Sequence, residues 1–154
     1  MPGDLRSLIA FDHKTFHKYP SDWFDREAWE DCEPWWMLID GKKTGCCAFQ
    51  RDRDFRDDLR RDGNNPYDRG SLYIVTTGIL PEARRLGLGR LLKCWEIAYA
   101  RRNRFSRVVT NTRRHNHPMI ELNRSVGFEV IRTTPHYYDA PDEATVVMEL
   151  RLPY

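Results

Sequence analysis

The chain has 154 residues, 40% of them hydrophobic and 12% aromatic, which suits one folded domain over residues 1–154. No apolar run approaches the roughly 20 residues of a membrane span, and no signal-peptide core opens the chain, so we expect a soluble cytoplasmic protein without a membrane partner. The net charge of +2 is unevenly distributed. Residues 81–132 hold 12 Lys and Arg against 4 Asp and Glu, a local charge of +8 that leaves −6 for the rest of the chain. This basic segment indicates either a solvated surface or the site of a polyanionic ligand.

The first elements are predicted to be helices. Leu5, Leu8 and Ile9 recur at helical spacing in the segment from Asp4 to Phe11. Ser21 is typical of the N-cap of a second, short helix.

A hairpin and a polar segment follow. Residues 35–39 and 44–50 have the composition of strands, and Asp40-Gly41 between them supplies the positive φ angles of a tight turn. Residues 51–70 are dense in Asp and Arg and too polar to bury, so we interpret them as a mobile flap. Its acidic side chains either attract a cationic amine or simply lie in solvent.

Residues 71–80 are rich in β-branched and aromatic residues and predict a buried central strand. Gly78 within it indicates a bulge or a close backbone approach. A helix is predicted after the Gly87-Leu88-Gly89 turn. Its apolar face is expected to contain Leu88, Leu91, Leu92, Trp95 and Tyr99, and its other positions Arg90, Lys93, Glu96 and Arg101.

A second strand and helix are predicted in the same order. Residues 107–112 form the strand, Asn116 caps the helix, and Gly127 ends it. The order strand, helix, strand, helix favours parallel pairing. Residues 128–134 and 145–152 then alternate well enough to close the sheet as an antiparallel pair.

The chemistry is predicted at the turn Arg84-Arg85-Leu86-Gly87-Leu88-Gly89, between the central strand and its helix. Backbone N–H groups converge at a helix N-terminus and hold phosphate, and glycine lets the ligand approach closely. Arg84, Arg85 and Arg90 add charge that a pyrophosphate would compensate. The Walker spacing and the full dinucleotide fingerprint are both missing from the sequence. The turn therefore predicts a pyrophosphate site of a short, arginine-led kind.

Two segments in sequence order resemble the signatures of the GCN5-related N-acetyltransferase (GNAT) family. Residues 79–89, Ile-Leu-Pro-Glu-Ala-Arg-Arg-Leu-Gly-Leu-Gly, look like the acetyl-CoA signature. The second signature is similar to Asn116-x-x-Met119-x-x-x-Asn123-x-x-x-Gly127-Phe128. The likeness runs over residues 72–150, and within the family it points distantly to the ribosomal-protein N-terminal acetyltransferases.

The resemblance implies an α/β (α+β) fold whose mixed sheet of six to seven strands is splayed at its centre and flanked by helices. The chain already looks helical at Asp4, so the family's usual first strand is expected to be absent, very short or outside this sequence. Acetyl-CoA is the implied co-substrate, with its pantetheine arm between the strands at 71–80 and 107–112, and an amide near Ile79 would serve as the oxyanion hole. The implied cofactor-binding residues are Thr77, Gly78, Ile79, Arg84, Arg85, Leu86, Gly87, Leu88, Gly89, Arg90, Asn116, Met119 and Asn123.

On the acceptor side the resemblance is to a pair of tyrosines before the last strand. Tyr137 and Tyr138, in the loop joining the last two strands, are therefore the predicted catalytic residues. Many family members have a tyrosine as the thiolate acid where this chain has Asn123, and the ribosomal-protein enzymes have a glutamate where it has Asn111. A weak base handles an α-amine, with a reference pKa near 7.7 to 8.0, more easily than a lysine amine near 10.4, which favours α-amino or small amine acceptors.

These observations predict an N-acetyltransferase, a monomer or homodimer, that passes an acetyl group directly to a primary amine of a small molecule or peptide. A non-catalytic acyl-CoA-binding or sensing module is the alternative, indicated by Asn111 and Asn123. A nucleic-acid partner is not expected, because the arginines gather at a glycine turn instead of a groove lined by aromatic side chains. No metal site is expected either, because neither the histidines nor the four cysteines have zinc-type spacing.

Overall fold

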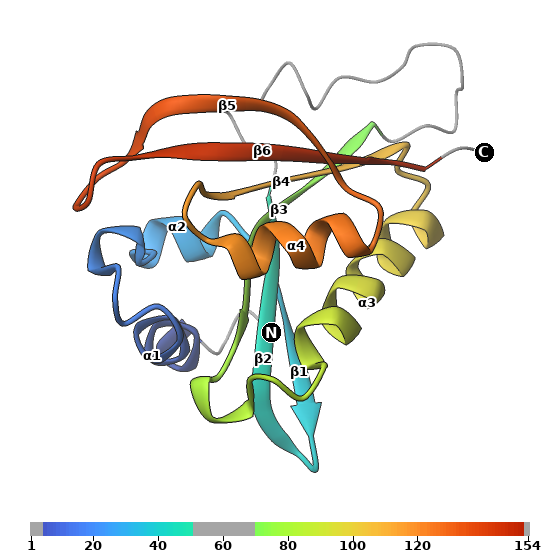
Figure 1. Cartoon of the computed structure of the whole chain (residues 1–154). Helices are drawn as coiled ribbons and strands as arrows, with labels where there is room; N and C mark the ends of the chain where they lie inside the picture. The colour runs from blue at the N-terminus through green and yellow to red at the C-terminus, as the bar shows by residue number, and fades with distance from the viewer. Residues whose placement is uncertain (1–4, 51–69, 153–154) are drawn as a thin grey trace.

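The computed structural model describes residues 5–50 and 70–152 (Figure 1). Two helices and three strands are followed by a helix, a strand, a helix and two final strands, and these elements have the order that the sequence predicts. They are α1 (Leu5–Thr15), the 3-10 turn η1 (Pro20–Asp22), α2 (Arg26–Glu30), β1 (Glu33–Ile39), β2 (Lys42–Gln50), β3 (Ser71–Ile79), the 3-10 turn η3 (Pro81–Ala83), α3 (Leu88–Arg102), β4 (Arg107–Arg113), α4 (His117–Ser125), β5 (Glu129–Tyr138) and β6 (Glu143–Arg151).

The six described strands form one mixed sheet in the order β1-β2-β3-β4-β6-β5. Every neighbouring pair is antiparallel except β3 and β4, which are parallel. Their pairing covers only Ser71–Ile74 against Arg107–Thr110, although β3 continues to Ile79 and β4 to Arg113. The sheet is therefore splayed at its centre, and this prediction is confirmed.

A bulge on β3 lies earlier than predicted. Ala48 of β2 pairs with Thr76 and Phe49 pairs with Ile74, so the ladder skips Val75. Gly78 pairs regularly with Cys46, and the expectation of a bulge at this glycine is wrong. The glycine is needed because α1 packs close: a Cβ there would lie 2.7 Å from Cγ2 of Thr15, a distance that real Cβ atoms do not reach.

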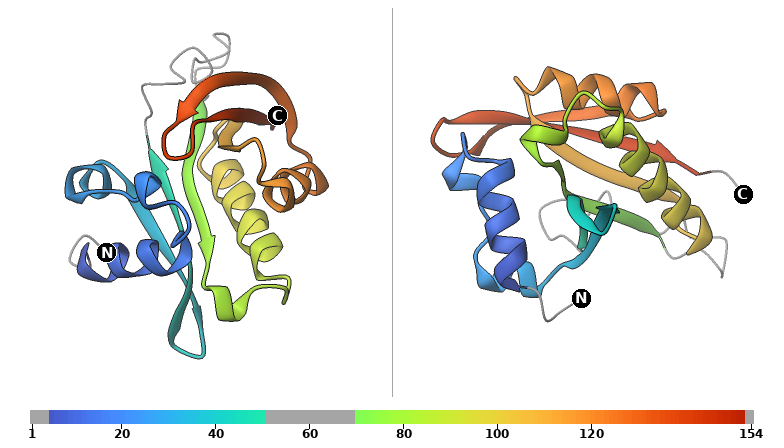
Figure 2. Two further views of the ribbon diagram at one scale, coloured as in Figure 1. Left: turned by 60° about the vertical axis from the view of Figure 1, so that its left-hand side comes forward. Right: turned by 90° about the horizontal axis from the view of Figure 1, so that it is seen from below.

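Helices cover both faces of the sheet (Figure 2). On one face α3 and α4 bury the main hydrophobic core, which includes Leu92, Val108 and Met148. On the other face α1 and α2 cover the end of the sheet formed by β1, β2 and β3, with Phe11 and Trp29 in a second core. Burial of these apolar side chains is the main source of stability for both layers.

Two further predictions differ from the structure. Helix α2 is capped by Asp25, whose Oδ1 accepts from the N–H of Ala28 at 2.8 Å, whereas Ser21 lies in η1. Tyr137 and Tyr138 are the last residues of strand β5 and not part of a loop. Of the predicted flap, residues 51–69 lie outside the described part of the chain, and no described strand precedes α1.

The buried face of α3 is also rotated from the predicted one. The structure buries Leu92, Lys93, Glu96, Ile97 and Ala100, while Leu91 is 57% exposed and Trp95 39% exposed. Trp95 and Tyr99 pack at the rim of the molecule against rings from the β1–β2 hairpin, Trp35 at 5.3 Å and Phe49 at 4.6 Å between ring centroids. The predicted stripe is therefore partly right: Leu92 lies in the main core and Leu88 and Tyr99 pack against it, whereas Leu91 and Trp95 are exposed.

Candidate functional site

Helix α3 begins at the glycine turn with unpaired amide groups. Gly87 is its N-cap, with φ +77°, and no side chain caps the helix. Leu91 N–H bonds to the carbonyl oxygen of Gly87 at 3.1 Å, so the N–H groups of the first turn have no partner within the helix. A Cβ built on Gly87 meets nothing within 4 Å. The turn thus offers open space and several N–H groups to an anion.

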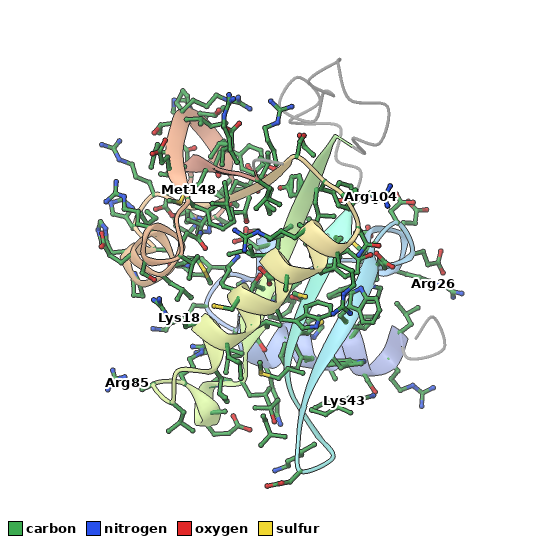
Figure 3. All side chains as sticks on the ribbon, turned by 90° about the vertical axis from the view of Figure 1, so that its right-hand side faces the viewer. Lys18, Arg26, Lys43, Arg85, Arg104 and Met148 are labelled. Atoms are coloured by element: carbon green, nitrogen blue, oxygen red, sulfur yellow. The ribbon has the colours of Figure 1, made fainter. Side chains whose placement is uncertain are left out.

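The three arginines of the turn do different things. Arg84 donates from its Nε to the carbonyl of Ile79 at 3.1 Å and from a terminal nitrogen to the carbonyl of Thr15 at 2.7 Å. Arg90 donates to the hydroxyl of Ser125 on α4 at 2.8 Å. Arg85, with φ +65°, is exposed and lies at the tip of the turn, pointing away from the body of the protein (Figure 3). Of the three arginines, Arg85 is therefore the one whose guanidinium points to solvent and makes no hydrogen bond of this kind.

Strand β3 supplies the second element of the site. Thr77, Gly78 and Ile79 follow the last residue that pairs with β4, so the edge of β3 that faces β4 is not used by the sheet here. The short η3 turn joins the glycine turn to this end of β3, which pairs with β2 but not with β4. The Arg84 contacts fix that connection by bonding the strand end to α1.

Helix α4 lies beside α3 and contributes the predicted asparagines and methionine. Asn116 caps it through Oδ1, which accepts from the N–H of Met119 at 3.3 Å. Asn123 is 1% exposed, and its Nδ2 meets the sulfur of Met148 at 3.7 Å. Its Oδ1 is buried without a hydrogen-bond partner among the described residues. A buried amide oxygen left unpaired is costly and suits a ligand donor.

On the opposite face of the sheet a polar network surrounds Asn111 of β4. The hydroxyl of Tyr73 donates to its Oδ1, and its Nδ2 donates to the hydroxyls of Tyr138 at 3.1 Å and Thr145 at 3.0 Å. Burial raises the pKa of Tyr138 to about 12, so its phenol is protonated at neutral pH. Tyr137 packs edge-on against Tyr138 with ring centroids 4.8 Å apart and belongs to the apolar cluster around Tyr73.

Arg113, at the end of β4, closes this face. All five of its N–H groups are accounted for. They bond to both carboxylate oxygens of Asp22 at 2.8 Å each, to Glu143 at 3.1 Å, and to the carbonyls of Asp139 and Pro141 at 3.0 Å each. Its guanidinium lies between the rings of Tyr19 and Tyr138, 4.3 and 4.4 Å from their centroids. The connection between α1 and α2 is thereby tied to the connection between β5 and β6.

Glu143 is held in its charged form by the same arrangement. Burial alone would raise its pKa, but the N–H of His115 at 2.7 Å, the guanidinium of Arg113 and the His115 ring outweigh that effect and lower the pKa. Such a carboxylate is a poor proton acceptor near neutral pH. Glu143 therefore acts as an anchor for Arg113 and not as a base.

Sequence reasoning found the turn and the Asn116 cap but missed Arg113, Asp22 and the polar network around Asn111. Asp22 and Arg113 are 91 residues apart, and no local pattern connects them. Among the described residues no cluster of three or more His, Cys, Asp and Glu side chains could hold a metal ion, and none of the described helices is long and apolar enough to cross a membrane.

Comparison with known proteins agrees with these features. The chain is 27% identical over 147 residues to a mycothiol acetyltransferase of Saccharomonospora viridis, covering 89% of the chain and 46% of that protein. It is 26% identical over 119 residues to the mycothiol acetyltransferase of Thermobifida fusca, covering 77% of the chain and 36% of that protein. The chain thus spans less than half the length of these relatives.

Solved structures share the fold. The ribosomal-protein-S18-alanine N-acetyltransferase from Escherichia coli superposes with a TM-score of 0.76 at 18% identity, over 99% of this chain and 90% of that one. NAA60 of Arabidopsis thaliana in complex with acetyl-CoA gives a TM-score of 0.78 at 18% identity, over 98% and 95% of the two chains. Residues 4–128 match the acetyltransferase (GNAT) family. With the splayed sheet and the glycine turn in place, the chain belongs to the GNAT family.

Proposed function

We propose that the chain is an acetyl-CoA-dependent N-acetyltransferase that passes an acetyl group to a primary amine. One observation carries the proposal: the amide-rich start of α3 adjoins a strand end, residues 75–79, that does not pair with β4. The first feature suits a pyrophosphate, and the second suits an extended arm with amide groups of its own, which needs backbone partners. Acetyl-CoA combines both parts in one ligand.

The described residues fit such a ligand. The N–H groups of residues 85–90 would hold the pyrophosphate, and Gly87 leaves the approach to them open. Thr77, Gly78 and Ile79 would pair with the pantetheine arm, with Asn116, Met119 and Asn123 of α4 on its other side. Arg84 would act mainly by fixing the turn, because its guanidinium is already bonded to two carbonyls. Acetyl-CoA supplies the activated acyl group.

The acceptor amine would enter from the face around Asn111 and Tyr138. Tyr138 accepts a hydrogen bond from Asn111, which leaves its own phenolic proton to orient the acceptor. A tyrosine with a pKa of about 12 does not take a proton from an ammonium near neutral pH. The acceptor must therefore reach the site as a neutral amine, which favours an α-amine or another amine of low pKa over lysine.

The proteins that this chain resembles have names as different as mycothiol acetyltransferase and ribosomal-protein-S18-alanine N-acetyltransferase. We therefore keep the acceptor class at a primary amine of a small molecule or a peptide. The proposal further takes the chain as one domain that works in the cytoplasm as a monomer or homodimer.

A non-catalytic acyl-CoA-binding module is the second candidate. Asn111 and Asn123, both amides, stand where a base and an acid would be useful, and Asn111 is fully engaged with its neighbours. Such a module would bind acetyl-CoA tightly and release no thiol.

Both candidates are tested together. Coenzyme A binding is measured by calorimetry, and thiol release from acetyl-CoA is then followed with a panel of small amines, peptides with free α-amines and the same peptides with blocked α-amines. The proposal predicts binding and thiol release that depends on a free amine. Binding without release from any amine would favour the sensing module, and no binding at all would contradict both.

A further inference from the structure

Two charged side chains of α3 are buried beneath the splayed part of the sheet. Lys93 is 1% exposed and Glu96 0% exposed, and their Nζ and Oε2 atoms are 3.2 Å apart. They occupy the inward face of the helix together with the apolar residues Leu92, Ile97 and Ala100. Charged residues are almost never buried this completely without a specific partner or task.

Both side chains bond to Thr77, on the end of β3 that does not pair with β4. The hydroxyl of Thr77 donates to Oε1 of Glu96 at 2.7 Å, and Nζ of Lys93 donates to the same hydroxyl at 3.3 Å. The ring of Phe128, which follows α4, lies on another side of Nζ with its centroid 5.8 Å away. The Lys93 ammonium therefore sits between α3, the end of β3 and Phe128, the residue before β5, at the floor of the splay.

The ammonium is not saturated by these contacts. It has three N–H donors, of which Thr77 takes one and the Glu96 carboxylate faces a second. The third faces the ring of Phe128, which at this distance is a weak partner. The buried thiol of Cys47 on β2 also lies near the pair and bonds to Glu96, and burial raises its pKa, so it stays protonated at neutral and moderately alkaline pH. A cation with spare donor capacity in a dry site interacts strongly with any negative charge that develops beside it.

Stability alone does not explain the pair. Removing two charges from water costs about as much as their attraction returns, and apolar residues of similar size usually serve a core equally well or better. Met or Leu at these two positions would continue the apolar surface that Leu92 and Ile97 form on the same helix. The pair is thus better explained by what it does at the floor of the splay.

We propose that the Lys93 ammonium stabilises the negative charge that develops on the coenzyme A sulfur when the acetyl group leaves, and that Glu96 and Thr77 are positioning residues that hold this ammonium; this rests on the proposed acetyl transfer. The acceptor nitrogen forms its bond to the acetyl carbon, the electron pair of the carbon–sulfur bond passes to sulfur, and the sulfur leaves as a thiolate paired with the Nζ ammonium. The proton that the acceptor nitrogen then releases passes to this thiolate and gives the free thiol, so Lys93 keeps its charge throughout.

The test compares coenzyme A with desulfo-coenzyme A, which lacks the sulfur, by calorimetry and by the ultraviolet absorbance of the bound thiolate. In the wild-type protein, coenzyme A should bind more tightly as pH rises from about 7 to 9, the range in which a thiol ionises, and desulfo-coenzyme A should not. The bound thiolate should appear at lower pH than that of free coenzyme A. Equal pH dependence for the two ligands would overturn the proposal without any variant.

The matched variant is the double replacement Lys93→Met with Glu96→Leu, which removes the pair without stranding one charge. It should keep its affinity for desulfo-coenzyme A, lose the pH-dependent preference for coenzyme A, and show kcat lower by about 100-fold, the smaller contribution expected of a group that stabilises a developing negative charge. The control, Glu121→Gln with Arg124→Met, removes the exposed ion pair of α4 at the same spacing and should change none of these.

The outcomes separate this inference from the proposed function. A double variant that keeps both the pH-dependent preference and a kcat within about 3-fold of the wild type would make the pair purely structural, and acetyl transfer by the wild type would still stand. A wild-type protein that does not transfer acetyl groups to any amine would remove the proposed function, and this inference with it.

Discussion

Arg113 at the end of β4 donates one hydrogen bond of 2.8 Å to each carboxylate oxygen of Asp22, which lies 91 residues earlier in the chain. The guanidinium is 5% exposed and the carboxylate 25%. This contact joins the connection between α1 and α2 to the carboxyl end of β4 and, through the other donors of Arg113, to the connection between β5 and β6. The Arg113–Asp22 ion pair, which we call the clamp, therefore bounds the face of the sheet on which we place the acceptor.

Removal of Asp22 should destabilise the fold strongly. Asp22→Ala leaves the buried Arg113 with only one carboxylate, Glu143, so we expect a loss of about 3 kcal/mol in the free energy of unfolding. Denaturant unfolding measures this loss in the free energy of unfolding. Glu121→Ala, which removes an exposed partner of Arg124, should cost less than about 1 kcal/mol. Equal costs for the two variants would contradict the role of the clamp.

Replacement of Gly87 should weaken cofactor binding as well as lower stability. Gly87→Ala places a Cβ in the open approach to the amide groups and strains a backbone with φ +77°. Gly41→Ala, in the β1–β2 turn, meets the same kind of strain at φ +75° with equally open surroundings. We expect similar losses of stability, of about 1 kcal/mol.

The difference between these two glycine variants lies in binding. Calorimetry should show coenzyme A affinity at least about 10-fold weaker for Gly87→Ala, or about 1.4 kcal/mol, and unchanged for Gly41→Ala. If both variants bound coenzyme A as the wild type does, the glycine turn would not be the pyrophosphate site.

Tyr138→Phe should slow acetyl transfer without affecting the cofactor. The phenol would donate one hydrogen bond to the acceptor, so kcat/KM for the amine should fall about 10-fold, while KM for acetyl-CoA stays the same. Tyr19→Phe is the control, because it keeps an aromatic ring against the other side of Arg113. A Tyr138→Phe enzyme with full activity toward every amine would remove Tyr138 from the acceptor site.

The buried carboxyl of Asp12 should make stability depend on pH. It is 3% exposed, and burial raises its pKa from 3.8 to about 6, against the opposing hydrogen bond from the N–H of Phe24. A folded-state pKa above the unfolded value means that the folded chain binds the extra proton, so stability falls as pH rises from about 4 to 6. The shift corresponds to about 3 kcal/mol at most.

Asp12→Asn checks this prediction, because its amide oxygen still accepts from Phe24 without a charge. Denaturant unfolding at a series of pH values should show that the variant gains on the wild type between about pH 4 and 6 and keeps that advantage at higher pH. Parallel curves for the two proteins over this range would show that the Asp12 pKa is close to its ordinary value.

The sequence predicted what depends on local backbone chemistry. The Gly87 turn, the Asn116 cap and the Asp40-Gly41 hairpin each follow from conformations that only a few residue types favour, and the structure has them at these positions. The splay between β3 and β4 came from resemblance to the family, since no residue pattern states where two parallel strands separate.

The features that the sequence did not predict depend on tertiary contacts. Lys93 and Glu96, three residues apart with opposite charge, have the pattern of an exposed helix pair, and only the packing of α3 reveals their burial. The bulge at Val75 arises from the register between β2 and β3. Gly78 was correctly marked as unusual, but its cause, the close approach of Thr15 from α1, lies more than sixty residues away in the sequence.

Hydrogen–deuterium exchange with and without acetyl-CoA tests the central claim most directly, because it reads the backbone amides that the account assigns to the ligand. Two separate segments, residues 85–90 at the start of α3 and residues 75–79 at the end of β3, should both exchange more slowly when acetyl-CoA is bound. Protection confined to other parts of the chain, or none at saturating ligand, would contradict the claim that these amides hold the pyrophosphate and the pantetheine arm.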